Sequence, residues 1–332
     1  MVMPCFGVVE EELTVVSAAN GRYSVKELAI LLEVRQMGKR EGMFVRLISY
    51  DLGGMGQCVV DGKREASWVW SEFGILYRRF DFSKYPAHVS NLACYAWKAP
   101  IVYEVAREFP GSVVIWVDSG VAFHKSLGFI VRDTRNSGGF SSDETARSVA
   151  RFSHEKTLDY FIDHFHFDPL LADIFREKRR GPEKSLDEPL RNLKNCNGAF
   201  SAHLYGSPKF TNITEKWLQC SLDKSCVCPA GSSRANHRQD QAALTLLAIN
   251  DGYSCAHRKV VSAHGLRHHD LILEKHGIIS AEKSDKTTKS EDPFCSHHHH
   301  QQRIEEKNAT TPVHNAVSTT ATEKKTRRRR RR

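Results

Sequence analysis

An aspartate at the end of an apolar run is the residue of this chain that most directly suggests chemistry. Residues 113–117, Val-Val-Ile-Trp-Val, lead into Asp118, which is followed by Ser119 and Gly120. Such a run is typical of a strand buried on both faces of a mostly parallel sheet, and ligands of open α/β sheets bind where such strands end. A carboxylate there can hold a divalent cation, and the cation can hold a phosphate. The alternative is that Asp118 only caps a turn.

The segments before this run predict an α/β fold. Strands are predicted over 13–18 and 44–50, and between them a helix over 25–37, with Ser24 as its N-cap and Glu27 completing a capping box. Strand, helix and strand within ~40 residues make a βαβ unit. No P-loop pattern and no well-placed GxGxxG follows either strand, so those nucleotide-binding classes are disfavoured.

Downstream of the run, the pattern predicts more helices than strands. Residues 129–139 are predicted as a strand and turn, and residues 142–163 as helical. A second polar region opens at 195–200, and a helix rich in Ala and Leu begins near Asp240. A carboxylate in a first helical turn suits the helix dipole, which is a structural explanation of Asp240.

Nine cysteines leave at least one unpaired in a monomer. Cys220, Cys226 and Cys228 lack the paired CxxC spacing of structural zinc, so the sequence favours a local disulfide or free buried thiols there. Histidines between 154 and 166 show no HExxH pattern.

The net charge of +9 belongs mostly to the C-terminal end of the chain. Residues 281–332 hold 13 Lys/Arg and seven Asp/Glu, so the first 280 residues carry only +3. We predict one domain over 10–275 and a disordered basic tail over 281–332. Such a tail can bind polyanions without sequence preference. No run approaches the ~20 apolar residues of a membrane span, and the first residues do not form a signal peptide.

Several separated segments together resemble one protein family. They are Tyr-Asp-Leu-Gly at 50–53, Phe-Asp-Phe-Ser-Lys-Tyr-Pro-Ala-His-Val at 80–89, Tyr-Ala-Trp-Lys at 95–98, Trp-Val-Asp-Ser at 116–119, and the regions 195–200 and 238–244. They resemble a largely uncharacterised family of animal glycosyltransferases, which is placed among the nucleotide-diphospho-sugar transferases of GT-A fold. The resemblance spans residues 13–269, and the block over 80–98 is its most specific part.

The resemblance implies a GT-A-type, Rossmann-like, mostly parallel sheet flanked by helices, and metal-dependent transfer of a sugar from a nucleotide-sugar donor. The cofactor would be Mn²⁺ or Mg²⁺, which neutralises the charge that builds on the departing nucleoside diphosphate. Asp118 is the metal ligand that this implies. The third position of the D-x-D pattern is Gly120, so one carboxylate is missing. His264 resembles the late histidine that completes the metal shell in related enzymes.

The resemblance also implies where substrates lie. Asp240 and Gln241 match the position at which related enzymes contact the donor sugar or the acceptor, and Asp240 is the best candidate for a catalytic base. Lys98 could approach a phosphate as a point charge, although a solvated surface lysine explains it equally well. The positions expected to contact the donor are Ala18, Ala19, Tyr50, Asp51, Lys98, Asn197 and Gly198.

Location, acceptor and activity stay open at this point. Family members are expected in the Golgi lumen behind an N-terminal anchor, which this chain does not display, so a cytoplasmic or nuclear location is not excluded. The acceptor is a glycan, protein or lipid that the sequence does not identify. Two alternatives remain: a catalytically inactive GT-A-like binding protein, suggested by Gly120, and a nucleic-acid-associated protein that acts through the Arg-rich tail.

Overall fold

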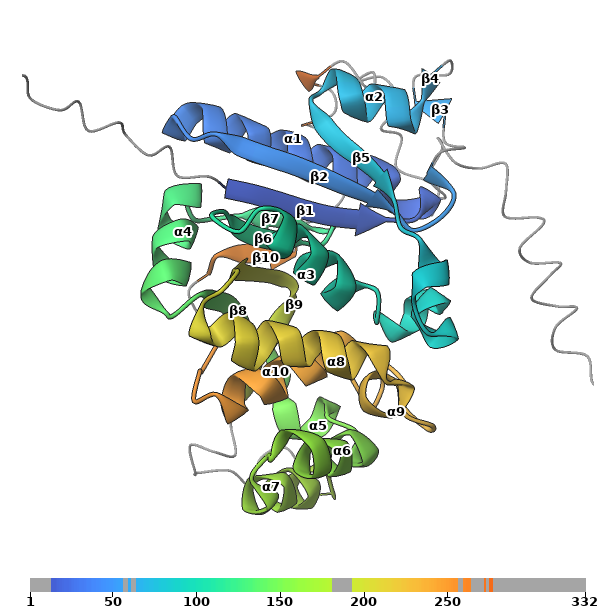
Figure 1. Ribbon diagram of the computed structural model, residues 1–332, viewed down its shortest axis with the longest axis vertical. Helices are drawn as coiled ribbons and strands as arrows, with labels where there is room; N and C mark the ends of the chain where they lie inside the picture. The colour runs from blue at the N-terminus through green and yellow to red at the C-terminus, as the bar shows by residue number, and fades with distance from the viewer. Residues whose placement is uncertain are drawn as a thin grey trace, which may run out of the picture. The chain divides into compact units, whose positions relative to one another are not determined.

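The computed structural model describes residues 13–55, 59–60, 64–180, 193–255, 259–263, 272 and 275–276, all within a compact unit that spans Met1–Cys295 (Figure 1). The predicted basic tail lies outside the described residues. In the described part, no helix is both long and apolar enough to cross a membrane.

A six-stranded sheet in the order β5-β2-β1-β6-β9-β8 forms the centre of the described unit. Its strands are β1 (Leu13–Ala19), β2 (Val45–Asp51), β5 (Ile75–Arg79), β6 (Val113–Val117), β8 (Phe140–Ser148) and β9 (Lys194–Leu204). The first four run parallel to one another, and β9 is antiparallel to both of its neighbours. The predicted α/β fold with a mostly parallel sheet is confirmed. Two short pairs complete the described strands: β3 (Val59–Val60) with β4 (Arg64–Glu65), and β7 (Val121–Phe123) with β10 (Val261–Ala263).

Helices cover both faces of the sheet. One hydrophobic core includes residues of α1 (Ser24–Glu41), α2 (Ala66–Glu72) and α4 (Leu127–Asn136). The core on the other face includes residues of α3 (Lys98–Glu108), α5 (Val149–Phe152), α6 (Glu155–Phe165), α7 (Pro169–Arg180), α8 (Lys216–Leu222), α9 (Lys224–Val227) and α10 (Gln239–Asn250). Figure 1 shows α1 on one side of β1 and β2, and α3, α8 and α10 on the other.

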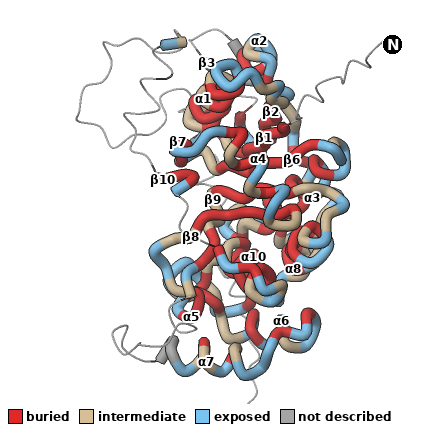
Figure 2. Tube along the Cα trace, turned by 90° about the vertical axis from the view of Figure 1, so that its left-hand side faces the viewer, coloured by how far each residue is buried: buried red, intermediate tan, exposed pale blue. Residues whose placement is uncertain are grey.

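The alternation of side chains along β1 and β6 separates these two cores. In β1, Val15 faces the α1 core and Val16 faces the α3 core, because successive side chains of a strand point to opposite faces. Every residue of β1 and β6 is buried, as Figure 2 shows. The predicted strands at 13–18 and 113–117 are therefore the two central strands of the sheet.

The strand order creates a switch point between β1 and β6. The chain builds β1, β2 and β5 outward in one direction and then returns through α3 to place β6 on the opposite side of β1. Connections from the two strands diverge there, which opens a crevice at their carboxyl ends. β1 ends at Ala19, and β6 ends at Val117, one residue before Asp118.

Of the strand and turn predicted over 129–139, the strand is wrong, because residues 129–136 belong to α4, and the turn is present at 137–138. The side chain of Ser126 accepts a hydrogen bond from the Phe129 amide at 3.1 Å, which caps the helix. The Glu41 carboxylate accepts two more, from the amides of Leu127 and Gly128. Both acceptors lie outside the predicted strand, and Glu41 belongs to α1.

The helix predicted over 142–163 is wrong in its first third. Residues 140–148 form β8, which pairs with β9 through an irregular register. Helical structure starts only at Val149 and continues in α6 after a break at Ser153. A polar segment becomes a strand here because a distant strand supplies its backbone hydrogen bonds.

The predicted capping box at the start of α1 is also wrong. Ser24 is the first helical residue, and its hydroxyl donates to the Gly21 carbonyl at 3.0 Å. Glu27 points into the core with no solvent exposure, where Ser49 donates to its Oε2 at 2.8 Å. The pKa of Glu27 is raised to about 8, mainly by burial and in smaller part by the negative charge of Asp51, while the hydrogen bond from Ser49 limits the rise.

Replacing Glu27 by Gln should flatten the dependence of stability on pH. The folded protein keeps the Glu27 proton between the ordinary pKa of 4.5 and about 8, while the unfolded chain releases it. Stability of the wild type therefore falls as pH rises through this window, by up to about 1.4 kcal/mol per pH unit. Urea unfolding at pH 5 and pH 8.5 measures the difference. Glu177→Gln, at an exposed position of α7, is the control, and equal pH dependence in Glu27→Gln and wild type would contradict the assignment.

Candidate functional site

Three charged side chains from three different elements meet at the carboxyl end of β6. Lys98 begins α3, Asp118 follows β6, and Asp240 lies in the first turn of α10. The Lys98 Nζ lies 2.8 Å from Asp118 Oδ1 and 3.3 Å from Asp240 Oδ2, and it donates to the Gly198 carbonyl at 2.9 Å. We call Lys98, Asp118 and Asp240 the charged triad. It lies at the edge of the sheet where the switch point predicts a ligand.

Lys98 is buried, with only 3% of its side chain exposed. The surface position that the sequence left open is therefore excluded. Three aromatic rings surround its ammonium group, at 5.3 Å (Tyr95), 5.8 Å (Trp97) and 5.3 Å (Trp116) from the ring centroids. Burial lowers the pKa of Lys98, but the charges of Asp118 and Asp240 outweigh it, so the pKa stays above its ordinary value. The lysine is a fixed cation.

Asp118 is the more accessible carboxylate of the triad, with 35% of its side chain exposed. Its Oδ1 accepts hydrogen bonds from Lys98 and, at 2.9 Å, from the Trp116 indole nitrogen. Its backbone amide donates to the Ala199 carbonyl at 2.9 Å, which holds it against β9. Among the described residues no contact engages its Oδ2, so this oxygen is available to a ligand.

Asp240 is almost fully buried, with 6% of its side chain exposed. Burial raises the pKa of Asp240 to about 6, and Lys98 limits the rise while the charge of Asp118 adds to it. A carboxyl group with a pKa of about 6 can exchange a proton near neutral pH, which is what a general base requires.

Gly198 and Gln241 lie against the triad through close backbone packing. A Cβ atom on Gly198 would come within 2.9 Å of the Gln241 Cβ, so β9 can approach α10 this closely only with glycine at this position. The Gln241 side chain donates to the Cys196 carbonyl at 2.8 Å. Asn197 uses its Oδ1 to accept from the Ala199 amide at 3.0 Å.

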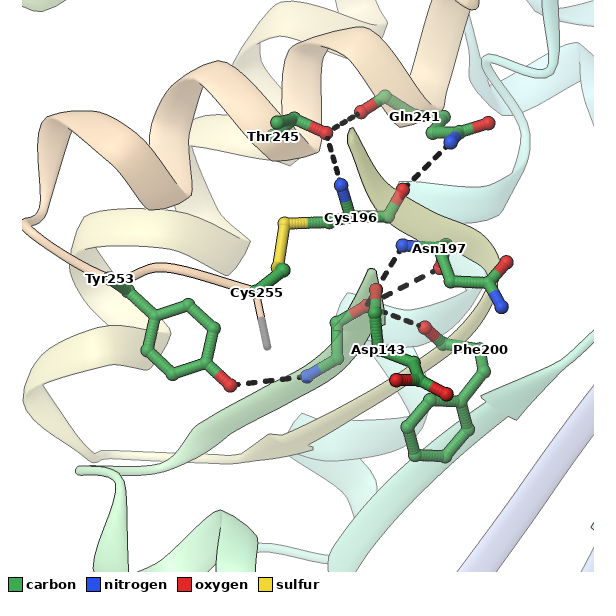
Figure 3. The surroundings of a disulfide bond; sticks show 9 residues. Asp143, Cys196, Asn197, Phe200, Gln241, Thr245, Tyr253 and Cys255 are labelled. Carbon is green, nitrogen blue, oxygen red and sulfur yellow. Dashed lines mark hydrogen bonds between the residues drawn. A yellow bond between two sulfur atoms is a disulfide. The ribbon is translucent and has the colours of Figure 1, made fainter. Parts of the chain in front are cut away.

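Two long-range disulfides hold the segments that carry these residues. Cys196–Cys255 joins β9 to the segment after α10, directly before Asn197 (Figure 3). Cys94–Cys228 fixes the segment that leads into Lys98. A third pair, Cys220–Cys226, is the local disulfide that the sequence left as one alternative.

The expected nucleotide contacts lie on β1 and β2, beside the triad rather than in it. Ala18 and Ala19 end β1 as small buried residues. The Asp51 carboxylate accepts from the amides of Gly53 and Met55 and from the Tyr77 hydroxyl, so it shapes its own loop. A role of Asp51 in binding remains a prediction.

Tyr50 faces away from Asp51 and lines a cavity of about 370 Å³. Its hydroxyl accepts from Arg78 at 3.3 Å, and its ring meets Phe80 edge to face. This cavity does not include any member of the charged triad. We locate the candidate site by the convergence of charge at the switch point, because that feature, unlike a cavity, requires a chemical explanation.

The described residues contain no cluster of three or more His, Cys, Asp or Glu side chains that could hold a metal ion. His264, the predicted late ligand, lies outside the described residues. Gly120 is exposed in the turn after Asp118, and a Cβ atom built on it meets nothing within 4 Å. The one carboxylate that could reach a metal from this turn is therefore that of Asp118.

Sequence reasoning missed Trp116 as a partner of Asp118. The two residues are separated by two positions, so they lie on the same face of an extended strand, and this spacing was a usable signal. It also missed Tyr95 as a neighbour of Lys98, and the pairings of Cys94 and Cys196, for which the sequence holds no local signal.

Solved structures with a similar fold include several glycosyltransferases. A galactosyltransferase in complex with donor and acceptor sugar analogues is 12% identical, with 71% of this chain and 70% of that chain covered and a TM-score of 0.37. Mouse xyloside xylosyltransferase 1 is 12% identical, with 74% of this chain and 84% of that chain covered and a TM-score of 0.38. Core-mannan synthase A from Aspergillus fumigatus, in a Mn/GDP form, is 8% identical, with coverage of 80% and 84% and a TM-score of 0.45.

No protein-family model and no curated protein matches the chain in sequence. At 8% to 12% identity, the likeness to solved structures concerns the fold alone. The chemistry of this chain therefore has to be argued from its own residues.

Replacing Lys98 by Met should strongly destabilise the protein, because it leaves the buried Asp240 without its cation. Breaking a buried ion pair by removing one partner costs about 3–5 kcal/mol. We expect a loss of that order in urea unfolding at pH 7, and recovery of part of it in Lys98→Met/Asp240→Asn. Lys125→Met, at an exposed position, controls for loss of a lysine. A Lys98→Met variant as stable as this control would show that the triad is not a coupled unit.

Proposed function

We propose that the chain is a glycosyltransferase that moves a sugar from a nucleotide-diphosphate donor to an acceptor. The observation that carries the proposal is the charged triad at the switch point between β1 and β6. It combines an accessible carboxylate at a strand end with a buried carboxyl group that has a pKa of about 6. The sequence resemblance of the 80–98 and 116–119 segments to a glycosyltransferase family supports the same reading.

The residues fit a divalent cation that is held jointly by the protein and the donor. Mg²⁺ sites commonly use one or two carboxylates, several waters and the phosphates of the substrate. Asp118 Oδ2 would supply the carboxylate, and the family resemblance suggests His264 as a further ligand. When bound, Mn²⁺ or Mg²⁺ neutralises the charge that develops on the departing diphosphate.

Lys98 would position the reacting groups rather than bind a phosphate. Two of its three N–H donors reach Asp118 and the Gly198 carbonyl, and Asp240 lies 3.3 Å away. Its charge attracts the carboxylates of both Asp118 and Asp240 and so holds them close to each other. Asp240 would then accept the proton of an acceptor hydroxyl, and Gln241 would lie beside the sugar.

We propose an oxidising compartment, the Golgi lumen, as the place of action. Disulfides persist in secretory compartments and are rare in reducing ones, and three pairs form among the described residues. The location behind a membrane anchor follows from the family resemblance alone.

Asp118→Asn should abolish metal-dependent binding of a nucleoside diphosphate. In the wild type, one nucleoside diphosphate of a panel should raise the midpoint of thermal unfolding only when Mn²⁺ is present, since a ligand of the folded state stabilises it by mass action. Asp118→Asn should show no such shift and should keep the wild-type circular dichroism spectrum. Asp163→Asn, at an exposed position of α6, should behave as wild type. A full shift in Asp118→Asn would remove Asp118 from the donor site.

Gly120→Asp should strengthen the metal site. The position is open, and its φ lies outside the left-handed region, so an aspartate fits without strain. A second carboxylate completes the D-x-D pattern, and we expect half-maximal nucleotide binding at about tenfold lower Mn²⁺. Gly120→Asn, of the same size without the charge, is the matched control. Equal Mn²⁺ requirements in the two variants would contradict a metal at this turn.

The second candidate is a donor-binding protein without transfer activity, which Gly120 in place of a carboxylate favours. The two candidates differ in whether they break down the donor. The measurement is release of nucleoside diphosphate from the nucleotide-sugar that carries the bound nucleotide. Tight binding with no release, across glycan, protein and lipid acceptors, would favour the binding protein.

A further inference from the structure

Four arginines gather around two aromatic rings beside the charged triad, and Arg151, at 5.8 Å from the ring centroid of Phe152, is the most distant of them. The guanidinium carbons of Arg147 and Arg238 lie 5.2 Å and 5.0 Å from the ring centroid of Phe152, and that of Arg234 lies 5.2 Å from the ring of Tyr95. The Arg238 amide also donates to the Phe152 carbonyl at 3.0 Å, which ties the start of α10 to α5. We call Arg147, Arg234 and Arg238 the arginine cluster.

No carboxylate of the described residues neutralises the positive charge of the arginine cluster. None of its members forms an ion pair with a carboxylate among the described residues. Burial lowers the pKa of Arg238, and the positive charges of Arg147 and Arg234 lower it further. Three like charges close together create a positive potential that attracts an anion, although water screens the exposed Arg147 and Arg234.

Two neighbouring residues at the start of α10 hold buried polar atoms without a hydrogen-bond partner among the described residues, Arg238 Nε and Gln239 Oε1. The next residue, Asp240, has its buried Oδ2 3.3 Å from the Lys98 ammonium group. Buried polar groups are nearly always satisfied, so each exception requires an explanation. Gln239 also has a φ of 39°, in the left-handed region that residues other than glycine seldom adopt. Orphaned groups on a strained backbone are typical of a binding site.

The arginine cluster is continuous with the charged triad. The Tyr95 ring lies 5.3 Å from Lys98 Nζ and 5.2 Å from the Arg234 guanidinium carbon, so it separates the two groups of charges. Tyr95 has a φ of 53°, a second left-handed residue at this place. Arg238 is two residues from Asp240 in sequence. A ligand held by the cluster therefore lies beside the group that we assign as the base.

We propose that the arginine cluster binds the oxyanion of an acidic sugar, which is the acceptor. The inference rests on the proposed function, because it places the acceptor beside Asp240. The anionic group is a carboxylate, sulfate or phosphate. A guanidinium that stacks on a ring keeps its N–H edge free, and this edge matches the two oxygens of such a group. The unpartnered Oε1 of Gln239 is complementary to a sugar hydroxyl group, which donates a hydrogen bond.

The test measures binding of glucuronate to the full-length chain by isothermal titration calorimetry, without metal or nucleotide and at low salt. Glucose is the uncharged reference ligand. The test variant is Arg147→Gln/Arg234→Gln, whose two positions are exposed. The matched control is Arg107→Gln/Arg135→Gln, which removes two exposed arginines of α3 and α4. Both variants keep the basic tail, so any binding of anions by the tail is the same in each.

We expect glucuronate, but not glucose, to bind the wild type and the control, and to bind Arg147→Gln/Arg234→Gln about tenfold more weakly or worse. Titrations with sodium sulfate and inorganic phosphate should follow the same order. Equal affinity of the test variant and the control for all three anions would overturn the proposal, as would absence of binding of any of them to the wild type.

A second arm separates the acceptor from the diphosphate of the donor. The nucleoside diphosphate that binds the wild type with Mn²⁺ is titrated into the same variants. Retained nucleotide binding with lost glucuronate binding supports an acceptor site. If the test variant loses only nucleotide binding, the acceptor site is overturned and the arginine cluster belongs to the donor site. The glucuronate titration needs neither metal nor nucleotide, so its result is independent of the Asp118→Asn experiment. Failure of the acceptor site and failure of the donor site can therefore be told apart.

Discussion

A buried ammonium group is the constraint on which the rest of this site depends. Removing a lysine from water costs several kcal/mol unless carboxylates and carbonyls replace the solvent. Lys98 obtains those partners from Asp118, Asp240 and the carbonyl of Gly198. Each partner belongs to a different element, so α3, β6, β9 and α10 have to meet at one point. The position of the candidate site is therefore set by the same interaction that stabilises this edge of the fold.

The covalent framework of the chain reinforces that meeting point. Cys94–Cys228 and Cys196–Cys255 close loops across 134 and 59 residues, and both place one cysteine within four residues of a contact to Lys98. Gly198 allows β9 to pack against α10 closely enough for its carbonyl to reach the ammonium group. Packing, disulfides and charge thus restrict the same few segments. Rigid support of this kind is what a preorganised site needs.

Charge is distributed unevenly around the triad. On one side, Asp118 exposes a carboxylate oxygen in a turn where Gly120 adds no second charge. On the other side, the arginine cluster holds positive charge that no described carboxylate balances. A site with one accessible carboxylate and an unneutralised cationic side suits two substrates with different needs. In the function that we propose, the donor brings its phosphates and a cation, and the acceptor brings an anion.

Local pattern determined the architecture of this protein to a large extent. The apolar runs at 13–18 and 113–117 identified the two central strands, because burial on both faces requires continuous apolar sequence. The aspartate that follows the second run marked the strand end, and an Ala- and Leu-rich stretch marked α10. These features depend on neighbours in sequence, so sequence alone could predict them.

Only the tertiary structure decided the environment of each charged or polar group. Lys98 is a plausible surface lysine until its partners, 20 and 142 residues away, remove it from water. The polar segment 140–148 becomes a strand because β9 pairs with it, and 127–136 becomes a helix with help from Glu41. Burial, pKa and charge balance are sums over contacts between distant segments. Such contacts exist only once the chain is folded, which is why the sequence could name the residues but not their surroundings.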